Sequence, residues 1–183
     1  MTAATRQTDG PSPWIERFGQ LVPKGGAVLD VAAGAGRHAR WFLHRGHPVT
    51  AVDCDTAALT TLSGAAGLRI VTADLEAGEP WPFAPGSFAA VVVVNYLHRP
   101  LLPDLVAAIA DSGVLLYDTF AVGNEAFGRP TNPDFLLRPG ELLQAVEGVL
   151  QVVAYEHGIV PGAAPRVRQR ICARRAEEAA AIG

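Results

Sequence analysis

Apolar, β-branched runs alternate with segments of helical periodicity along most of the chain. The continuous apolar run Phe88–Val94 is typical of a parallel strand buried on both faces. Six further segments are expected to be strands: residues 27–31, 48–53, 68–73, 113–117, 150–156 and 166–174. A loop containing Gly and Pro joins the last two strands at residues 158–165, without a helix, and therefore predicts an antiparallel hairpin.

Helical spacing of apolar residues predicts a helix in most of the intervals between these strands. The expected helices cover residues 14–22, 37–44, 56–62, 103–110 and 139–146. Residues 75–87 are rich in Pro and Gly and are expected to form a loop. This alternation predicts an α/β fold with a Rossmann-like, doubly wound, mostly parallel sheet and a C-terminal antiparallel β-hairpin.

The chain has 183 residues, of which 49% are hydrophobic, as expected for a single globular domain. We expect a flexible lead-in over residues 1–13, one domain over residues 14–183, and a substrate lid in the irregular insertion at residues 121–138. A formal net charge of −3 gives no electrostatic basis for nucleic-acid binding. The polar N-terminal stretch contains no run typical of a signal peptide or a membrane span.

Cys54 and Cys172 are not surrounded by metal-type spacing and are expected to be buried, reduced thiols of a cytoplasmic protein. No constellation of histidines with ligand-like spacing is present, so no metal site is expected. The sequence leaves the choice between a monomer and a homodimer open.

The first predicted strand ends in an acid and leads through a small-residue turn, with Gly34 and Gly36, into the next helix. Glycines allow a sharp turn and the close approach of a ligand, which would lie against the positive end of the helix. The turn also fits the pattern G-x-G-x-x-A, and Asp53 follows about twenty residues on, as in dinucleotide-binding sheets. This pattern predicts a nucleotide-type site but does not choose the nucleotide.

Three acids, Asp30, Asp53 and Asp74, stand at the ends of the first three predicted strands. Asp30 would repel a pyrophosphate and attract an ammonium group. Asp53 can accept hydrogen bonds from a ribose diol, and Asp74 can accept one from an adenine amine. No basic residue precedes Arg37 in the turn to meet phosphates. The three acids therefore favour S-adenosylmethionine, which carries an ammonium, a sulfonium, a ribose diol and an adenine amine.

From about Trp14 to Arg174 the chain resembles the class I S-adenosylmethionine-dependent methyltransferases. Residues 29–36 (LDVAAGAG) are similar to the family's first motif, although Ala32 stands where the first glycine is usual. Residues 51–53 (AVD) match the ribose motif and residues 73–75 (ADL) the adenine motif. The resemblance implies a seven-stranded sheet, and the small size loosely resembles the tellurite-resistance and other small-molecule methyltransferases. Candidate cofactor contacts are Asp30, Ala32, Gly34, Gly36, Asp53, Cys54, Asp74, Leu75 and Asn95.

The family's active site implies catalytic roles for Asn95, Tyr96 and His98, which follow the fourth strand. Methyl transfer is an in-line displacement that depends mainly on alignment, and a base is needed only for a protonated acceptor. Candidate contacts to a small-molecule acceptor are Tyr117, Asn124 and Arg129.

Two alternatives stay open. A nicotinamide-dependent oxidoreductase would want a catalytic Tyr/Lys pair, but the only lysine, Lys24, precedes the first strand. A non-catalytic module that binds S-adenosylmethionine would share every motif.

Overall fold

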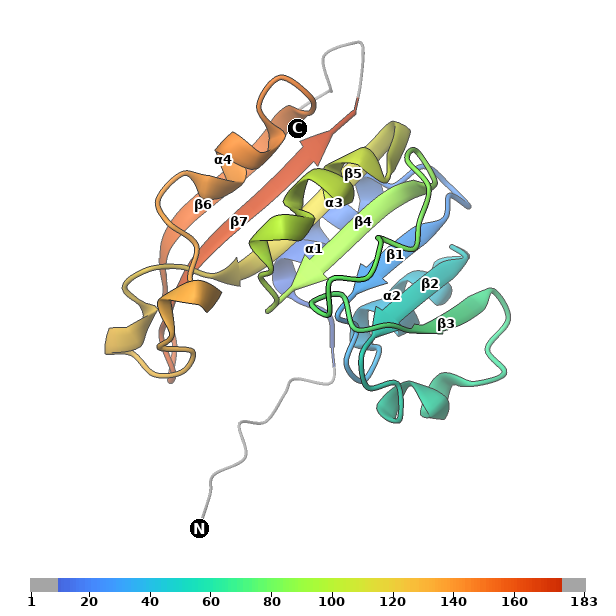
Figure 1. The fold of residues 1–183 in the computed structure, drawn as a ribbon, viewed down its shortest axis with the longest axis horizontal. Coiled ribbons are helices and arrows are strands. Elements are labelled where there is room, and N and C mark those ends of the chain that lie inside the picture. Colours follow the sequence, from blue (N-terminus) through green and yellow to red (C-terminus); the bar gives the residue numbers. More distant parts are fainter. Residues whose placement is uncertain (1–9, 176–183) are drawn as a thin grey trace.

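The computed structural model describes residues 10–175, which form a seven-stranded sheet with helices on both faces (Figure 1). The strand order is β3-β2-β1-β4-β5-β7-β6. The strands are β1 (Val28–Val31), β2 (Val49–Asp53), β3 (Leu68–Thr72), β4 (Phe88–Val94), β5 (Ile109–Phe120), β6 (Gln151–Val160) and β7 (Arg166–Arg174). The first five strands are parallel, whereas β7 is antiparallel to both β5 and β6. The predicted doubly wound sheet and its terminal hairpin are confirmed.

Two short helices cover each face of the sheet. Helices α1 (Pro13–Phe18) and α2 (Arg37–Leu43) pack on one face, and α3 (Leu102–Ala107) and α4 (Glu141–Val146) pack on the other. Strand β4 lies in the middle and alternates between the two cores, with Val91 and Val93 on the α3/α4 side and Ala90 and Val92 on the α1/α2 side. Burial on both faces explains why this strand is apolar at nearly every position.

Several predicted element types or bounds differ from the structure. Residues 56–62 form only a 3₁₀ helix, η2 (Ala58–Leu62), instead of an α-helix. The helix predicted to reach residue 110 ends at Ala107, and β5 begins two residues later. Ile109 is buried and pairs with Phe88 on β4, so tertiary pairing overrides local helical spacing there. The crossover from β3 to β4 contains no helix and is the loop that the sequence predicts.

The expectation that both cysteines are buried was wrong for Cys54. Cys54 is exposed just beyond the end of β2, whereas Cys172 on β7 is buried, which raises the pKa of its thiol to about 12. Of the predicted flexible lead-in, residues 1–9 lie outside the described residues. Ser12, in the part that is described, is buried, and its hydroxyl accepts a hydrogen bond from Trp14 N at the start of α1. A side chain that caps a helix fixes this segment in place.

The insertion at residues 121–138 contains the 3₁₀ helices η4 (Asn124–Ala126) and η5 (Pro133–Phe135). An ion pair beneath it joins Arg99, in η3 (Arg99–Leu101), to the buried carboxylate of Glu141, with Nε 2.6 Å from Oε1. Arg99 also donates to the carbonyls of Asp134 and Leu136. These contacts attach the insertion to the segment that follows β4, next to the candidate site.

Candidate functional site

The carboxyl ends of β1, β2, β3 and β4 converge on one pocket. It is lined by Ala32, Asp53, Cys54, Ala73, Asp74, Leu75, Glu76 and Tyr96. From β1 the chain proceeds to β2 and β3 on one side, and from β4 it proceeds to β5 on the other side. The neighbouring strands β1 and β4 therefore form the switch point at which doubly wound sheets bind their ligands. Five of the nine residues proposed from the sequence as cofactor contacts are therefore brought together here.

The two glycines of the turn after β1 have different roles. Gly34 has a φ of +55°, and a Cβ at this position would meet no atom within 4 Å, so its backbone faces open space. Gly36 is buried, and a Cβ there would lie 2.6 Å from Leu62 and 2.7 Å from Leu59 of η2. Gly36 was predicted as a cofactor contact, but the structure assigns it to packing between the start of α2 and η2.

Asp53 connects the end of β2 to this turn. One carboxylate oxygen accepts a hydrogen bond from Gly34 N at 2.8 Å, and the other accepts one from Asp55 N at 3.0 Å. The oxygen that accepts from Gly34 N has a second lone pair for a ligand hydroxyl, whereas the other oxygen also accepts from the Cys54 thiol. The adjacent Cys54 thiol lies 3.6 Å from Asp53, and this hydrogen bond raises the pKa of the thiol. A protonated thiol at the pocket wall is a weak nucleophile.

Asp30 does not line the pocket. Its carboxylate is 1% exposed and accepts a hydrogen bond from Ala39 N, in the first turn of α2, at 2.9 Å. Burial is the main reason that its pKa rises from 3.8 to about 7. The predicted contact with a cofactor ammonium is thus replaced by a bond to the helix N-terminus, where the helix dipole favours an acidic group. His38 lies beside it, with Nδ1 3.9 Å from Asp30, and burial lowers the pKa of this imidazole to about 3.

A second cavity of about 410 Å³ shares Ala73, Asp74 and Leu75 with the pocket and extends along the loop after β3. Trp81 lines it, and its indole Nε1 is buried without a hydrogen-bond partner among residues 10–175. Asp74 is exposed and accepts one backbone hydrogen bond, from Glu76 N at 2.9 Å. An adenine ring, which carries both amine donors and ring-nitrogen acceptors, matches this combination of an acid and an unsatisfied donor. The residues present therefore fit the adenosine part of S-adenosylmethionine.

The three catalytic candidates follow β4 in order. Asn95 is exposed and holds a left-handed φ of +60°, and its side-chain oxygen accepts a hydrogen bond from Arg168 at 2.8 Å. Tyr96 lines the pocket, and burial together with the nearby Glu76 raises the pKa of its hydroxyl above the ordinary value. His98 lies outside the pocket lining, with Nδ1 3.9 Å from Glu76. A phenol with a raised pKa stays protonated, so Tyr96 is a hydrogen-bond donor rather than a base.

Two of the three acceptor candidates do not reach a cavity. Tyr117 is fully buried and donates its hydroxyl to the carbonyl of Tyr96 at 2.9 Å. Asn124 is also fully buried, with its amide bonded to backbone groups of Val167, Gly128 and Pro130. Both predictions are corrected by burial, because every polar atom of these side chains is used inside the fold. Arg129 is exposed on the insertion.

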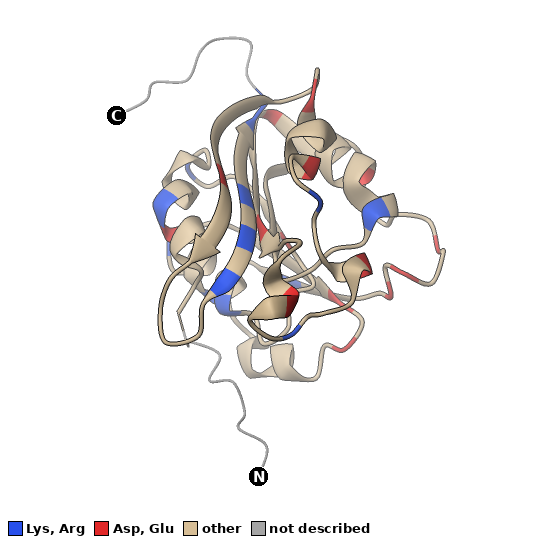
Figure 2. Cartoon of the chain, turned by 90° about the vertical axis from the view of Figure 1, so that its left-hand side faces the viewer, with Lys and Arg blue, Asp and Glu red and all other residues tan. Residues whose placement is uncertain are grey.

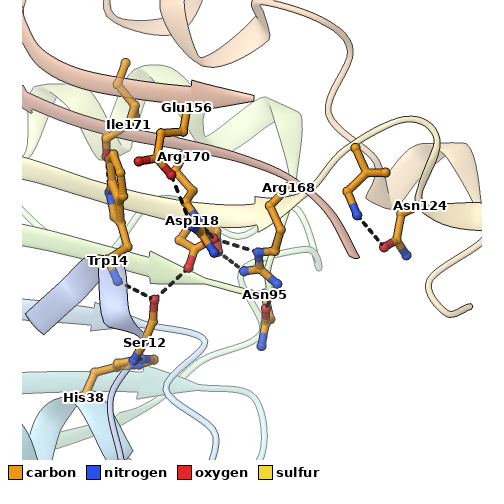
Figure 3. Close-up of polar contacts among 11 residues, drawn as sticks. Ser12, Trp14, His38, Asn95, Asp118, Asn124, Glu156, Arg168, Arg170 and Ile171 are labelled. Atoms are coloured by element: carbon orange, nitrogen blue, oxygen red, sulfur yellow. Dashed lines mark hydrogen bonds and ion pairs between the residues drawn. The ribbon is translucent and has the colours of Figure 1, made fainter. Parts of the chain in front are cut away.

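A buried network centred on Asp118 was not predicted as a functional unit (Figure 3). Asp118 accepts hydrogen bonds from Ser12 Oγ at 2.7 Å, Arg168 Nε at 2.7 Å and Arg170 Nε at 3.1 Å. Arg168 also reaches Asn95, so the network extends from the N-terminal segment to the pocket edge. The one signal in the sequence is the spacing of Arg166, Arg168 and Arg170 at every second residue, which places them on one face of a strand.

Residues 28–115 match the family model described as the methyltransferase domain. Residues 28–115 therefore carry a methyltransferase domain, of the class I, S-adenosylmethionine-dependent type. No curated protein matches the chain. The matched family confirms the cofactor expected from the sequence and favours it over a nicotinamide.

Solved structures share the fold of this methyltransferase domain. The 1,6-didemethyltoxoflavin N1-methyltransferase of Burkholderia thailandensis, solved with its substrate and S-adenosylhomocysteine, is 19% identical, with a TM-score of 0.67 over 90% of this chain and 77% of that chain. A methyltransferase of Mesorhizobium loti is 17% identical, with a TM-score of 0.69 over 87% and 96% of the two chains. TehB of Haemophilus influenzae is 15% identical, with a TM-score of 0.68 over 88% and 61%. Since 695 solved chains match, the fold alone does not select an acceptor.

Within residues 10–175, no helix is long and apolar enough to cross a membrane. The same residues contain no group of three or more His, Cys, Asp or Glu side chains that could hold a metal ion.

Proposed function

We propose that this chain transfers a methyl group from S-adenosylmethionine to a small-molecule acceptor at the carboxyl ends of β1–β5. The observation that carries the proposal is the convergence of Asp53 and Asp74 on one pocket, with the open backbone of Gly34 hydrogen-bonded to Asp53. When bound, the cofactor supplies an electrophilic methyl group. Asp53 would hold the ribose diol, and Asp74, Leu75 and Trp81 would surround the adenine.

The residues near β4 favour an acceptor that is already nucleophilic. Asn95 does not titrate, Tyr96 stays protonated, and His98 lies outside the pocket lining. Alignment of the acceptor is then the main contribution of the protein, as expected for a proximity effect. A thiolate or an oxyanion fits this site better than an alcohol or an amine, which would require a base.

The surroundings of the site support a small acceptor. The insertion at residues 121–138 would form its lid, since Phe127 and Phe135 are 39% and 47% exposed there and offer apolar cover. A net charge of −3 favours a small molecule over nucleic acid. The toxoflavin methyltransferase of similar fold also binds a small molecule. Free Cys54 and Cys172 fit a reducing compartment, and we assign the protein to the cytoplasm as a monomer or a homodimer.

Calorimetric titration with S-adenosylhomocysteine and with NADH tests the cofactor assignment. Binding of the first alone is expected, and binding of NADH alone would overturn the proposal. The acceptor class is tested by incubating the protein and S-adenosylmethionine with a cell extract split by ultrafiltration. S-adenosylhomocysteine should form with the small-molecule fraction. Formation only with the macromolecular fraction would contradict a small acceptor, and binding without turnover on either fraction would indicate a non-catalytic module.

A further inference from the structure

Basic residues recur along β7 (Figure 2). Arg168 and Arg170 extend from the same face of this strand, and their side chains are only 11% and 15% exposed. Both guanidinium groups donate to one carboxylate oxygen of Asp118, whose side chain is 3% exposed. Two nearly buried positive charges thus share one buried negative charge. The second acid near Arg170, Glu156, is 48% exposed, so solvent screens its charge.

The pKa of Arg168 reflects the closeness of these charges. Burial lowers the pKa of Arg168, and the like charges of Arg170 and Arg37 lower it further, whereas Asp118 raises it. A buried excess of positive charge is costly unless a further anion balances it.

The guanidinium groups are also accessible to a small ligand. Arg168 and Arg170 line a groove of about 170 Å³ with residues 156–160 of β6. Gly158 is the residue paired with Arg168 across the hairpin and has no side chain to cover the guanidinium. A guanidinium has five N–H donors, and the hydrogen bonds made within residues 10–175 use three on Arg168 and two on Arg170.

Arg168 also fixes the orientation of the Asn95 amide. Because a guanidinium only donates hydrogen bonds, the amide of Asn95 must direct its oxygen toward Arg168, at 2.8 Å. In Figure 3 the amide nitrogen of Asn95 points away from Arg168. That nitrogen has no hydrogen-bond partner among the described residues. The guanidinium groups in the groove and this exposed amide nitrogen therefore each offer a donor to an acceptor of hydrogen bonds.

We propose that Arg168 and Arg170 form a binding site for a carboxylate or a similar oxyanion in this groove. This proposal rests on the proposed function, since the anion is either the carboxylate of the cofactor or an acid group of the methyl acceptor. A guanidinium group holds its N–H donors in one plane and can bind a carboxylate or a phosphate through two hydrogen bonds. This geometry suits the cofactor carboxylate and an acid group of the acceptor equally.

The test compares wild type with Arg170→Gln, and with Arg166→Gln as a matched control. Arg166 lies on the same face of β7, but within residues 10–175 it donates only to the carbonyls of Ala164 and Pro165. Calorimetry would measure the binding of S-adenosylhomocysteine, of 5′-methylthioadenosine, which lacks the carboxylate and the ammonium, and of inorganic phosphate. A charge-assisted hydrogen bond is worth roughly a tenfold change in affinity or more. Arg166→Gln should stay within about twofold of wild type.

The ligand that loses affinity in Arg170→Gln identifies the source of the anion. A loss for S-adenosylhomocysteine but not for 5′-methylthioadenosine assigns the site to the cofactor carboxylate. Unchanged binding of both nucleosides with a loss for phosphate, added to the complex with S-adenosylhomocysteine, assigns it to the acceptor. Unchanged binding of all three ligands, or an equal loss in Arg166→Gln, would overturn the proposal.

Asn95→Asp is a second variant that does not depend on the folding of Arg170→Gln. Asn95 is exposed, and aspartate also tolerates a left-handed backbone. The new carboxylate still accepts from Arg168 but replaces a donor with a negative charge, so the same ligand should bind roughly tenfold more weakly. Wild-type affinity in this variant would contradict the site. Failure of both nucleosides to bind wild type would defeat the proposed function, whereas phosphate titration of the unliganded protein would still test the anion site.

Discussion

The carboxylate of Asp53 accepts a hydrogen bond from the backbone amide of Gly34 at 2.8 Å. This bond joins the end of β2 to the turn after β1, two segments that the sequence motifs treat separately. The acid proposed for the ribose therefore also holds the turn against which the rest of the cofactor would lie.

Replacing Asp53 by asparagine should weaken the binding of S-adenosylhomocysteine by about 1.5–3 kcal/mol, because charged hydrogen bonds to the ribose become neutral. Titration calorimetry measures this change. Asp55→Asn is the matched control, since Asp55 lies in the same loop and accepts only the amide of Ala57. Equal affinities of the two variants would refute the ribose assignment. Asp118 would not serve as a control, because its carboxylate accepts hydrogen bonds from Ser12, Arg168 and Arg170.

Asp30 should make the stability of the unliganded protein depend on pH. Its pKa is about 7 in the fold and 3.8 ordinarily, so the folded state holds its proton more strongly than the unfolded state. The resulting stability is fully present below pH 3.8 and is lost as the pH rises through about 7.

Asp30→Asn removes this titration and keeps an acceptor for Ala39 N. Urea denaturation at pH 4.5, 6 and 8 should show an advantage of the variant that grows up to pH 7 and then stays constant. One pKa unit corresponds to about 1.4 kcal/mol, so the advantage at pH 8 should exceed about 1 kcal/mol. Asp111→Asn, at an exposed position, should show no such trend. A constant difference between Asp30→Asn and wild type at all three pH values would argue against a buried, protonated Asp30.

Glu141 should stabilise the insertion through Arg99. Burial alone would raise the pKa of Glu141, but hydrogen bonds from Arg99 and Arg138 outweigh burial and leave it below its ordinary value of 4.5. Its stabilising effect is then present above pH 4.5 and is lost as the pH falls through the lower, folded value. Glu141→Gln should cost about 2 kcal/mol at pH 7 and progressively less as the pH falls below 4.5. Thermal melts at pH 7 and at pH values below 4.5 would measure these losses of stability. The control is Glu147→Gln, which changes an exposed acid just after α4. Equal losses in the two variants would refute a stabilising role for the Arg99–Glu141 ion pair.

The elements that the sequence predicts best are those whose burial is decided locally. Strand β4 was predicted residue by residue because both of its faces are buried, and the ends of β1–β3 then located Asp53 and Asp74. The Asp118 network joins Ser12 to a residue 106 positions away and Arg168 to one 50 positions away, and no local period encodes such pairs. For the same reason the sequence wrongly predicted that Asn124 and Tyr117 contact the acceptor, whereas their polar atoms are hydrogen-bonded inside the fold.

Ala32 holds a left-handed φ of +52° at the pocket wall, where related first motifs have glycine. An L-residue in this region costs roughly 1–2 kcal/mol of stability, and Ala32→Gly would remove this strain. Glycine also makes the unfolded chain more flexible, which lowers the stability of the variant by about 0.5–1 kcal/mol. The variant should therefore be as stable as wild type or more stable by up to about 1.5 kcal/mol in urea denaturation. Ala145→Gly, in α4, should instead lose about 1 kcal/mol because glycine is a poor helix former. If Ala32→Gly lost as much as Ala145→Gly, the alanine would not be strained, and the turn after β1 would accept it without cost.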